Sequence, residues 1–313
     1  MILQDFLVRT NGGLFCRYGD FYLDPVDPVK HAVISHGHGD HATPGHEFAY
    51  CTPPTYLFME SRFAKIYLPQ TQQISFHQPF QLGEVTLTFL PAGHILGSAQ
   101  VLMEHRGIRY LYTGDYKLQP DPTCEAFEGT KAHVLITEST FANPETSHPQ
   151  PEEEILKLSA VRSNIMLGAY SLGKAQRLTA MIHQFCPEKT VLIHHSILAI
   201  HRIYQYFGVD LGPYQTYNRR AMKVQDGKEK IYIVPPMTFR SYSRAKNVVR
   251  VFASGWKHLQ RHNQMELYIS DHVDWNEILQ CIENTEPQEV WTLHGDGSHL
   301  IAHLGNSIPV RMI

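Results

Sequence analysis

The stretch Ser-His-Gly-His-Gly-Asp-His at residues 35–41 decides what we expect of this chain. It follows a short apolar run, residues 32–34, that predicts a strand. Four side chains that can bind a metal stand within six positions: His36, His38, Asp40 and His41. Imidazole and carboxylate are the usual ligands of zinc and similar divalent ions.

The spacing inside this loop favours two ions over one. His36 and His38 are two positions apart, so at a strand end they point to the same side. Gly37 and Gly39 let the backbone turn tightly, so that Asp40 and His41 can face a second ion. Chance placement of histidines in a polar loop is the alternative, since the chain has 20 histidines.

Single donors follow three further predicted strands, each beside a glycine. Residues 85–90 lead to His94, residues 109–113 lead to Asp115, and residues 289–293 lead to His294. A lone His or Asp in a turn is more often structural than metal-binding. Because all three repeat one arrangement, we expect them to complete two metal shells together with the loop at 35–41.

The remainder of the chain changes character near residue 150. Before it, short apolar runs predict strands, including one at 74–77, and a helix over 56–66. After it, strands and helices alternate in a rhythm typical of βα units with a parallel sheet. The tail returns to strands, the first over 266–269. We therefore predict a domain of residues 161–255 inserted into a domain of residues 1–160 and 256–313.

Composition narrows the class of protein. The chain has 313 residues, 43% of them hydrophobic, a formal net charge of −3 and a sequence pI near 6.7. This predicts a globular protein without the overall basic charge of a nucleic-acid coating protein. The absence of a secretory signal or an apolar span, with five scattered cysteines, favours a soluble cytoplasmic protein with no membrane contact.

These motifs resemble those of the metallo-β-lactamase-fold hydrolases. The resemblance implies an α/β (α+β) fold, an αββα sandwich with the metals at one edge. It implies that one ion is held by His36, His38 and His94, and a second by Asp40, His41 and His294. Asp115 would bridge the two ions. Asp24, after Phe-Tyr-Leu, would hold the ligand loop by hydrogen bonds without touching an ion, although spacing alone allows an exposed turn aspartate.

Three further motifs resemble the β-CASP branch of this superfamily. They are Glu138 in Ile-Thr-Glu-Ser-Thr, His272 in Ile-Ser-Asp-His, and His294 in Leu-His-Gly. The long interval between residues 138 and 272 is where that branch carries an inserted β-CASP domain. The resemblance implies a two-metal phosphodiesterase, that is, a nuclease. A small-molecule hydrolase of the glyoxalase or lactonase type and an inactive scaffold are the alternatives.

The catalytic residues we predict are Asp40, Glu138 and His272. Two cations about 3.5–4 Å apart can activate water and neutralise the charge that gathers on phosphorus. The leaving oxygen then needs a proton, and His272 is the candidate general acid. Glu138 would hydrogen-bond it, orient it and raise its pKa.

Phosphate contacts are predicted where a helix opens after a buried strand. Ser171, Gly173 and Lys174 would offer N–H groups and a positive charge to a phosphate, although an ordinary helix start with a solvated lysine is an equal alternative. A second basic stretch could follow a nucleic-acid backbone, but a charged surface loop is favoured for it: Arg219, Arg220, Lys223, Lys228 and Lys230.

The choice between DNA and RNA depends on resemblance alone, because no residue pattern reads a 2′-hydroxyl. His294 is typical of RNA-processing β-CASP members. The compact chain and the stretches Gly-Ala-Tyr-Ser-Leu-Gly-Lys-Ala-Gln-Arg and Phe-Ala-Ser-Gly-Trp are most similar to bacterial ligase-associated DNA exonucleases. We therefore predict a DNA exonuclease with two divalent ions, zinc or manganese, that works with a DNA ligase or other repair proteins. An RNA-processing ribonuclease is the alternative.

Overall fold

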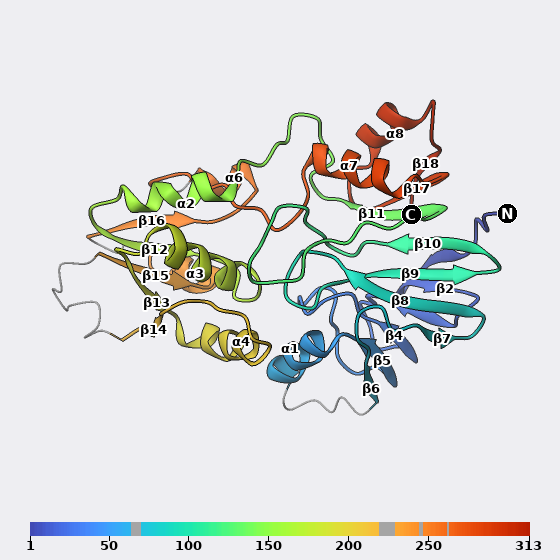
Figure 1. The fold of residues 1–313 in the computed structure, drawn as a ribbon, viewed down its shortest axis with the longest axis horizontal. Coiled ribbons are helices and arrows are strands. Elements are labelled where there is room, and N and C mark those ends of the chain that lie inside the picture. Colours follow the sequence, from blue (N-terminus) through green and yellow to red (C-terminus); the bar gives the residue numbers. More distant parts are fainter. Residues whose placement is uncertain (64–69, 219–228, 244–246, 262) are drawn as a thin grey trace. The chain divides into compact units, whose positions relative to one another are not determined.

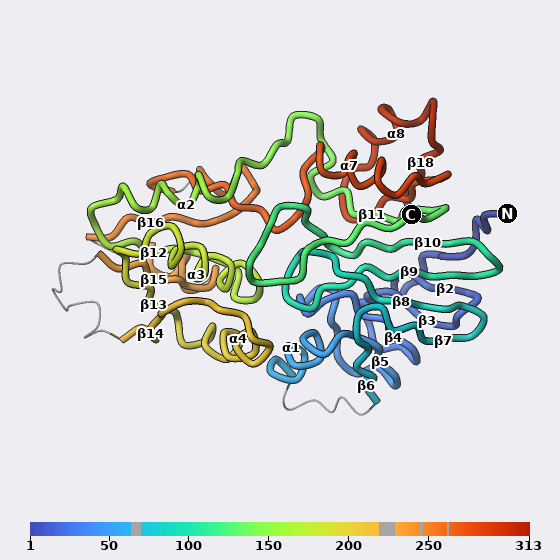
Figure 2. Tube along the Cα trace, in the orientation of Figure 1, coloured from blue at the N-terminus to red at the C-terminus, as the bar shows by residue number. Residues whose placement is uncertain are grey.

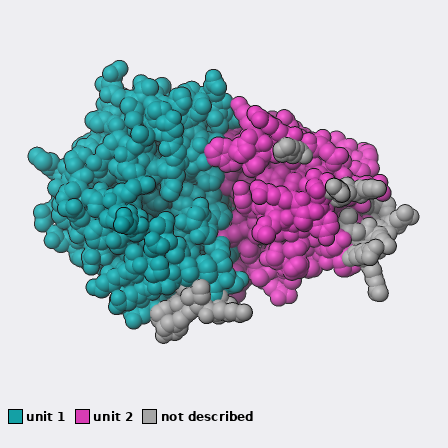
Figure 3. Space-filling view, turned by 180° about the vertical axis from the view of Figure 1, so that it is seen from behind, with its two compact units in different colours: residues 1–120, 124–147, 272–313 teal, residues 121–123, 148–271 magenta. Residues whose placement is uncertain are grey.

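The computed structural model describes residues 1–63, 70–218, 229–243, 247–261 and 263–313, which divide into two compact units (Figure 3). Unit 1 comprises residues 1–120, 124–147 and 272–313, and unit 2 comprises residues 121–123 and 148–271. The trace in Figure 2 follows the chain into unit 2 and out again.

Unit 2 extends beyond the predicted insertion of residues 161–255 at both ends. Helix α2 (Pro151–Ser159) buries Ile155 and Leu158 in the core of unit 2, and Leu267 and Ile269 lie in the same core. Apolar burial therefore assigns both flanking segments to the inserted unit, a feature that local patterning does not reveal.

Unit 1 contains two sheets in the described part of the chain (Figure 1). The first has six strands in sequence order: β1 (Leu7–Thr10), β2 (Gly13–Cys16), β3 (Phe21–Leu23), β4 (His31–Val33), β5 (Phe48–Cys51) and β6 (Thr71–Gln73). The second has seven, in the order β18 (Val310–Met312), β17 (Glu289–Gly295), β11 (Val134–Ser139), β10 (Ile108–Tyr112), β9 (Ala99–His105), β8 (Val85–Pro91) and β7 (Phe80–Leu82).

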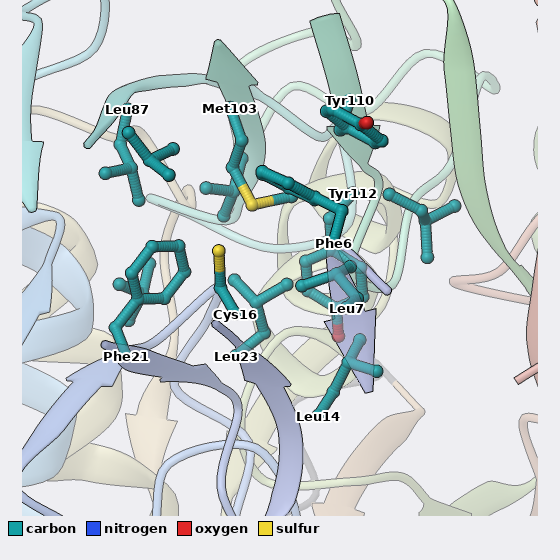
Figure 4. Packing of buried hydrophobic residues seen from close by; sticks show 14 of the residues in the cluster. Phe6, Leu7, Leu14, Cys16, Phe21, Leu23, Leu87, Met103, Tyr110 and Tyr112 are labelled. Atoms are coloured by element: carbon teal, nitrogen blue, oxygen red, sulfur yellow. The ribbon is translucent and has the colours of Figure 1, made fainter. Parts of the chain in front are cut away.

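The core of unit 1 lies between these sheets. Phe21 and Leu23 of the first sheet belong to the same buried cluster as Leu87 and Met103 of the second (Figure 4). Alternate residues of each strand enter it because strand side chains point to opposite faces in turn. The Phe6 ring stacks on Tyr110 with centroids 3.8 Å apart.

Helices cover the outer face of each sheet. Met59 of helix α1 (Pro53–Phe63) lies in one buried cluster with Ala32 of β4 and with Ile34, the residue that follows that strand. Helices α7 (Trp275–Thr285) and α8 (Ser298–Leu304) contribute apolar side chains to a cluster on the outer face of the second. The resulting layers confirm the predicted αββα sandwich.

Unit 2 is built on a parallel sheet of five strands among the described residues. Their order is β14 (Gln215–Thr216), β13 (Thr190–Ile193), β15 (Lys230–Val234), β12 (Asn164–Gly168) and β16 (Val248–Phe252). Helices α2, α3 (Lys174–Phe185) and α4 (His195–Tyr206) cover one face, and α5 (Pro236–Ser241) and α6 (Lys257–Gln260) pack on the other. Burial on both faces explains the continuous apolar strands.

Two predicted strands are wrong. Residues 74–77 follow β6 rather than form a strand, and His77 has a φ of 63°, which ends an extended run. Residues 266–269 join no sheet, because their N–H groups donate to side chains: Leu267 N–H to Gln260 Oε1 at 3.1 Å and Tyr268 N–H to Glu154 Oε2 at 2.8 Å. None of the described helices combines the length and the apolar character needed to cross a membrane.

Candidate metal centre and active site

Four donors from three separate segments converge at one edge of the sandwich. Donor atoms of His36, His38, His94 and Asp115 all lie within 4.8 Å of one another. His38 Nδ1 is 3.0 Å from His36 Nε2 and 3.0 Å from His94 Nε2. The loops after β4, β8 and β10 deliver these residues, so the strand-end prediction and the arrangement agree in space.

The chemistry of this group fits a divalent ion. Nitrogens bound to one tetrahedral zinc are about 3.3 Å apart, from bonds of about 2.0–2.1 Å. The histidine nitrogens here are already that close. Burial, followed by the nearby positive charge of His41, lowers the pKa of His36 well below its usual value, and the neutral imidazole is the form that binds metal.

The residues predicted to hold a second ion, Asp40, His41 and His294, lie less close together than the first group, and the Asp40 side chain is 81% exposed. His41 Nε2 is 3.4 Å from Asp115 Oδ2 and 3.9 Å from Asp40 Oδ2. The ring of His294 lies 5.5 Å from that of His41, between centroids. Asp115 Oδ2 is also 3.6 Å from His36 Nε2, so one carboxylate faces both groups.

Asp24 holds the loop of residues 35–41 in place through hydrogen bonds. Its carboxylate accepts hydrogen bonds from Ser35 N–H at 2.7 Å, from Ser35 Oγ at 2.6 Å and from Tyr112 Oη at 2.8 Å. It also lies 2.8 Å from His41 Nδ1, with a side chain only 5% exposed. Burial alone would lower the pKa of His41, but the Asp115 and Asp24 carboxylates outweigh it and raise that pKa well above its usual value.

Ser35 and Tyr112 both contact Asp24 in this site, and sequence reasoning did not identify them. Ser35 directly precedes His36, and Tyr112 lies three residues before Asp115, each at or just after the end of a strand. This closeness to a predicted ligand is the only sign in the sequence that could have pointed to them. Gly114 is needed for the same packing, since a Cβ there would lie 2.9 Å from the Ser35 side chain. Its φ of 55° also favours glycine.

Glu138 and His272 form a pair beside the metal donors. Glu138 is 1% exposed and its carboxylate lies 2.9 Å from His272 Nδ1, while His272 is 28% exposed at the side chain. Glu138 Oε1 also accepts the Tyr116 N–H at 3.1 Å. The His272 ring is 4.9 Å from that of His94. Orientation through Nδ1 leaves the opposite ring nitrogen, Nε2, as the atom that could carry a proton to a substrate.

Asp115, Glu138 and His272 form a second group of close donor atoms, within 4.8 Å of one another. Sequence reasoning did not anticipate that His272 would come so close to Asp115. Two roles are therefore open to His272, a metal ligand and a proton donor, and the metal content of a His272 variant separates them.

The structure gives Lys174 a role other than the predicted phosphate contact. Its ammonium is buried, donates to Ile269 O at 2.6 Å and pairs with Asp271 at 3.0 Å, all within unit 2. The Gly173 N–H donates to Gln176 Oε1 at 2.8 Å. These donors at the start of α3 serve the fold, so a phosphate site at Ser171, Gly173 and Lys174 lacks support. Of the second basic stretch, Lys230 is buried in β15, and Arg219, Arg220, Lys223 and Lys228 lie outside the described residues.

Arg177 completes this buried network. Its Nη1 donates to Ser270 O at 2.6 Å and to Asp271 Oδ1 at 3.2 Å, and its Nε lies 3.4 Å from Asp121 Oδ2. The network fixes residues 270–271, the residues directly before His272. Arg177 ends the stretch of residues 168–177 quoted above, but nothing in that stretch pointed to its partners, which lie about 56 and 94 positions away.

We expect Arg177→Met to destabilise the protein by about 3 kcal/mol, because it removes a buried cation that pairs with the Asp121 and Asp271 carboxylates. Urea unfolding followed by circular dichroism measures this. Arg162→Met, an exposed arginine of unit 2, is the matched control and should change stability by less than about 0.5 kcal/mol. Equal stability of the two variants would contradict the assigned role.

Comparison with known proteins agrees with this geometry. A family model described as the beta-lactamase superfamily domain matches residues 18–195, more than half of the chain. A protein named "Probable DNA ligase" from Opitutus terrae is 30% identical over 92% of this chain and 29% of its own length. "Endoribonuclease YSH1" from Gibberella zeae is 29% identical over 54% of this chain and 25% of its length.

Two further relatives extend the comparison. "Cleavage and polyadenylation specificity factor 73" from Drosophila melanogaster is 27% identical over 88% of this chain and 48% of its length. The chain thus spans between about a quarter and a half of these curated relatives. A crystal structure of a protein of unknown function from Enterococcus faecalis V583 shares the fold, with a TM-score of 0.59 at 15% identity, covering 90% of this chain and 79% of that one. The chain therefore belongs to the β-lactamase superfamily, and the predicted resemblance to its β-CASP branch of metal-binding nucleases is confirmed.

Proposed function

We propose that this protein is a two-metal nuclease that hydrolyses phosphodiester bonds of DNA as an exonuclease. The observation that carries the proposal is the position of the Glu138–His272 pair within 4.8 Å of Asp115, the carboxylate that faces both metal-donor groups. A phosphodiesterase needs charge neutralisation and a proton donor side by side, and this edge of unit 1 offers residues for both.

The donor residues divide into two sets in this proposal. His36, His38 and His94 would hold one ion, Asp40, His41 and His294 would hold the other, and Asp115 would contact both. Bound zinc or manganese ions would activate water and offset the negative charge that builds up on the phosphate. Asp24 keeps His41 in the orientation that presents Nε2 toward the centre.

The remaining steps belong to the protein side chains. His272 stands with Nδ1 on Glu138 and gives the proton of its opposite nitrogen to the leaving oxygen of the broken ester. Glu138, 1% exposed, keeps the ring from rotating and favours its charged form. The same pair distinguishes this site from that of a small-molecule hydrolase whose leaving group needs no proton.

DNA is the polymer we favour, and a DNA ligase is the partner enzyme that fits. Support comes from the Opitutus terrae relative, whose printed name is that of a DNA ligase and which matches 92% of this chain. Cleavage of RNA is the second candidate, because the Gibberella zeae relative is named an endoribonuclease. Because DNA and RNA have the same scissile phosphodiester group, the two candidate functions are distinguished by comparing cleavage of DNA and RNA substrates.

End-labelled single- and double-stranded DNA and RNA, offered with zinc or manganese, test the proposal. We expect DNA labelled at one end to release mononucleotides progressively, while RNA of the same sequence is cut more slowly. Product sizes from strands labelled at the 5′ or the 3′ end give the polarity. Internal fragments from RNA alone would favour the endoribonuclease. Metal-loaded protein that cleaves neither polymer would overturn the proposal.

A further inference from the structure

Exposed apolar side chains gather at one edge of the parallel sheet of unit 2. Ten large hydrophobic residues are exposed in the described part of the chain, and three of them follow neighbouring strands within four positions of the strand end. Tyr170 follows β12 and is 49% exposed, Met237 follows β15 and is 84% exposed, and Trp256 follows β16 and is 41% exposed. Because β15, β12 and β16 are adjacent and parallel, their carboxyl ends share one edge.

Buried aromatic rings support this edge. The Tyr170 ring meets Phe252, the last residue of β16, edge to face at 6.1 Å between centroids. Phe239 of α5 packs on the same Phe252 ring at 5.4 Å. Gly168 at the end of β12 makes room for both, since a Cβ there would lie 2.4 Å from Phe252 and 2.8 Å from Phe239. Tyr170 is thus held in place while half of its surface stays open.

The surrounding charge favours a polyanion. Residues 231–265 contain no aspartate or glutamate, although acidic residues exceed basic ones in the whole chain by 30 to 27. Arg240 of α5 and Lys257 of α6, which begins next to Trp256, are both exposed. Exposed aromatic rings among cations are the combination that binds single-stranded nucleic acid, because bases stack on the rings and phosphates pair with the charges.

The same edge leads directly to the candidate acid. A Cβ on Gly255 would lie 2.9 Å from the Ser270 side chain, so residue 270 packs beside the turn that carries Trp256. Arg177 and Lys174 then fix Asp271, and the next residue in the chain is His272. The turn that carries Trp256 therefore packs on Ser270, which lies two residues before the candidate proton donor in the chain.

We propose that Tyr170 and Trp256 form a stacking site for unpaired bases of single-stranded DNA, with Arg240 and Lys257 contacting its phosphates. The inference depends on the proposed function, since it supplies the polymer-binding surface of that nuclease. Stacking is indifferent to base identity because every base has a π face, so the site suits an enzyme that cleaves DNA without reading its sequence.

Binding of a fluorescein-labelled thymidine 20-mer to the metal-loaded protein tests the site, with phosphorothioate linkages to slow cleavage and fluorescence anisotropy as the measurement. Tyr170→Ala and Trp256→Ala should each weaken binding about 5- to 150-fold for the base that loses its stack. Tyr170→Phe and Trp256→Phe keep a ring and should remain within about threefold of the unchanged protein.

A strand of the same length without bases separates stacking from general destabilisation. The unchanged protein should bind it more weakly than the thymidine strand, and the alanine variants should bind it as the unchanged protein does. Tyr206→Ala is the matched control, because Tyr206 is 76% exposed at the last residue of α4, about 16 Å along that helix from its start after β13. It should bind both strands normally.

Two results would overturn the inference. Alanine variants that bind the thymidine strand normally, in a protein that cleaves DNA, would remove the stacking site and leave the proposed function intact. Tight binding of a uridine strand with no binding of the thymidine strand would overturn the choice of DNA. Failure of the unchanged protein to cleave any polymer or bis(p-nitrophenyl) phosphate counts against the proposed function instead.

Discussion

Asp115→Asn should abolish turnover, by at least about a thousandfold, and lower the metal content in the same preparation. The Asp115 carboxylate is 3.6 Å from His36 Nε2 and 3.4 Å from His41 Nε2, so it faces both donor groups. An amide of the same shape has lost the negative charge that two cations share. Metal analysis per chain, together with the rate on labelled DNA, measures both effects.

The controls for Asp115→Asn separate ligand loss from misfolding. Asp27→Ala removes an exposed aspartate of unit 1 and should keep both metal content and rate. Circular dichroism should show that the Asp115 variant retains its secondary structure, because the imidazoles it contacts are held by their own loops. Two ions per chain with normal turnover in Asp115→Asn would refute the bridging assignment.

The convergence of His36, His38, His94 and Asp115 could be predicted from sequence because each of these residues follows an apolar strand. The strands before these residues end at one edge of the sandwich, so the loops that follow them lie close together. His94 and Asp115 therefore lie beside the loop at residues 35–41, although no local sequence pattern records that contact. Local chemistry and the strand pattern point to the same place. That agreement explains why these donors converge as expected.

Lys174 shows where such reasoning fails. A lysine at a helix start after Ser and Gly has the same sequence signature whether it faces a phosphate or a buried carboxylate. Lys174 pairs with Asp271, almost a hundred residues later in the chain, whose carboxylate lies 3.0 Å from the Lys174 ammonium. Long-range pairing of this kind leaves no local pattern, and Arg177 was missed for the same reason.

The ends of unit 2 are likewise determined by the packing of buried side chains, which local sequence patterns do not reveal. Residues 266–269 have the composition of a strand, but the side chains of Glu154 and Gln260 take their N–H groups and Leu267 fills the core of unit 2. A strand needs a partner edge as well as a pattern. Strands of only two or three residues, such as β14 and β18, are too short to show a period in the sequence.

His272→Ala should lose about a hundred- to ten-thousandfold in the rate of DNA cleavage while keeping its metals, because a general acid contributes that much to a poor leaving group. The alcohol oxygen of DNA needs a proton to leave, whereas p-nitrophenolate does not. The variant should therefore hydrolyse bis(p-nitrophenyl) phosphate at close to the normal rate. Comparison of the two substrates in one preparation measures the acid role directly.

Metal content decides between the two roles open to His272, since Asp115, Glu138 and His272 also form a close donor group. Loss of an ion in His272→Ala, with both substrates slowed equally, would make this histidine a ligand and rule out the acid. His303→Ala, an exposed histidine on α8 of the same unit, should leave metal content and both rates unchanged. Glu138→Gln keeps an acceptor for the ring but removes the charge that favours its protonated form, so it should slow DNA cleavage alone and by less than His272→Ala does.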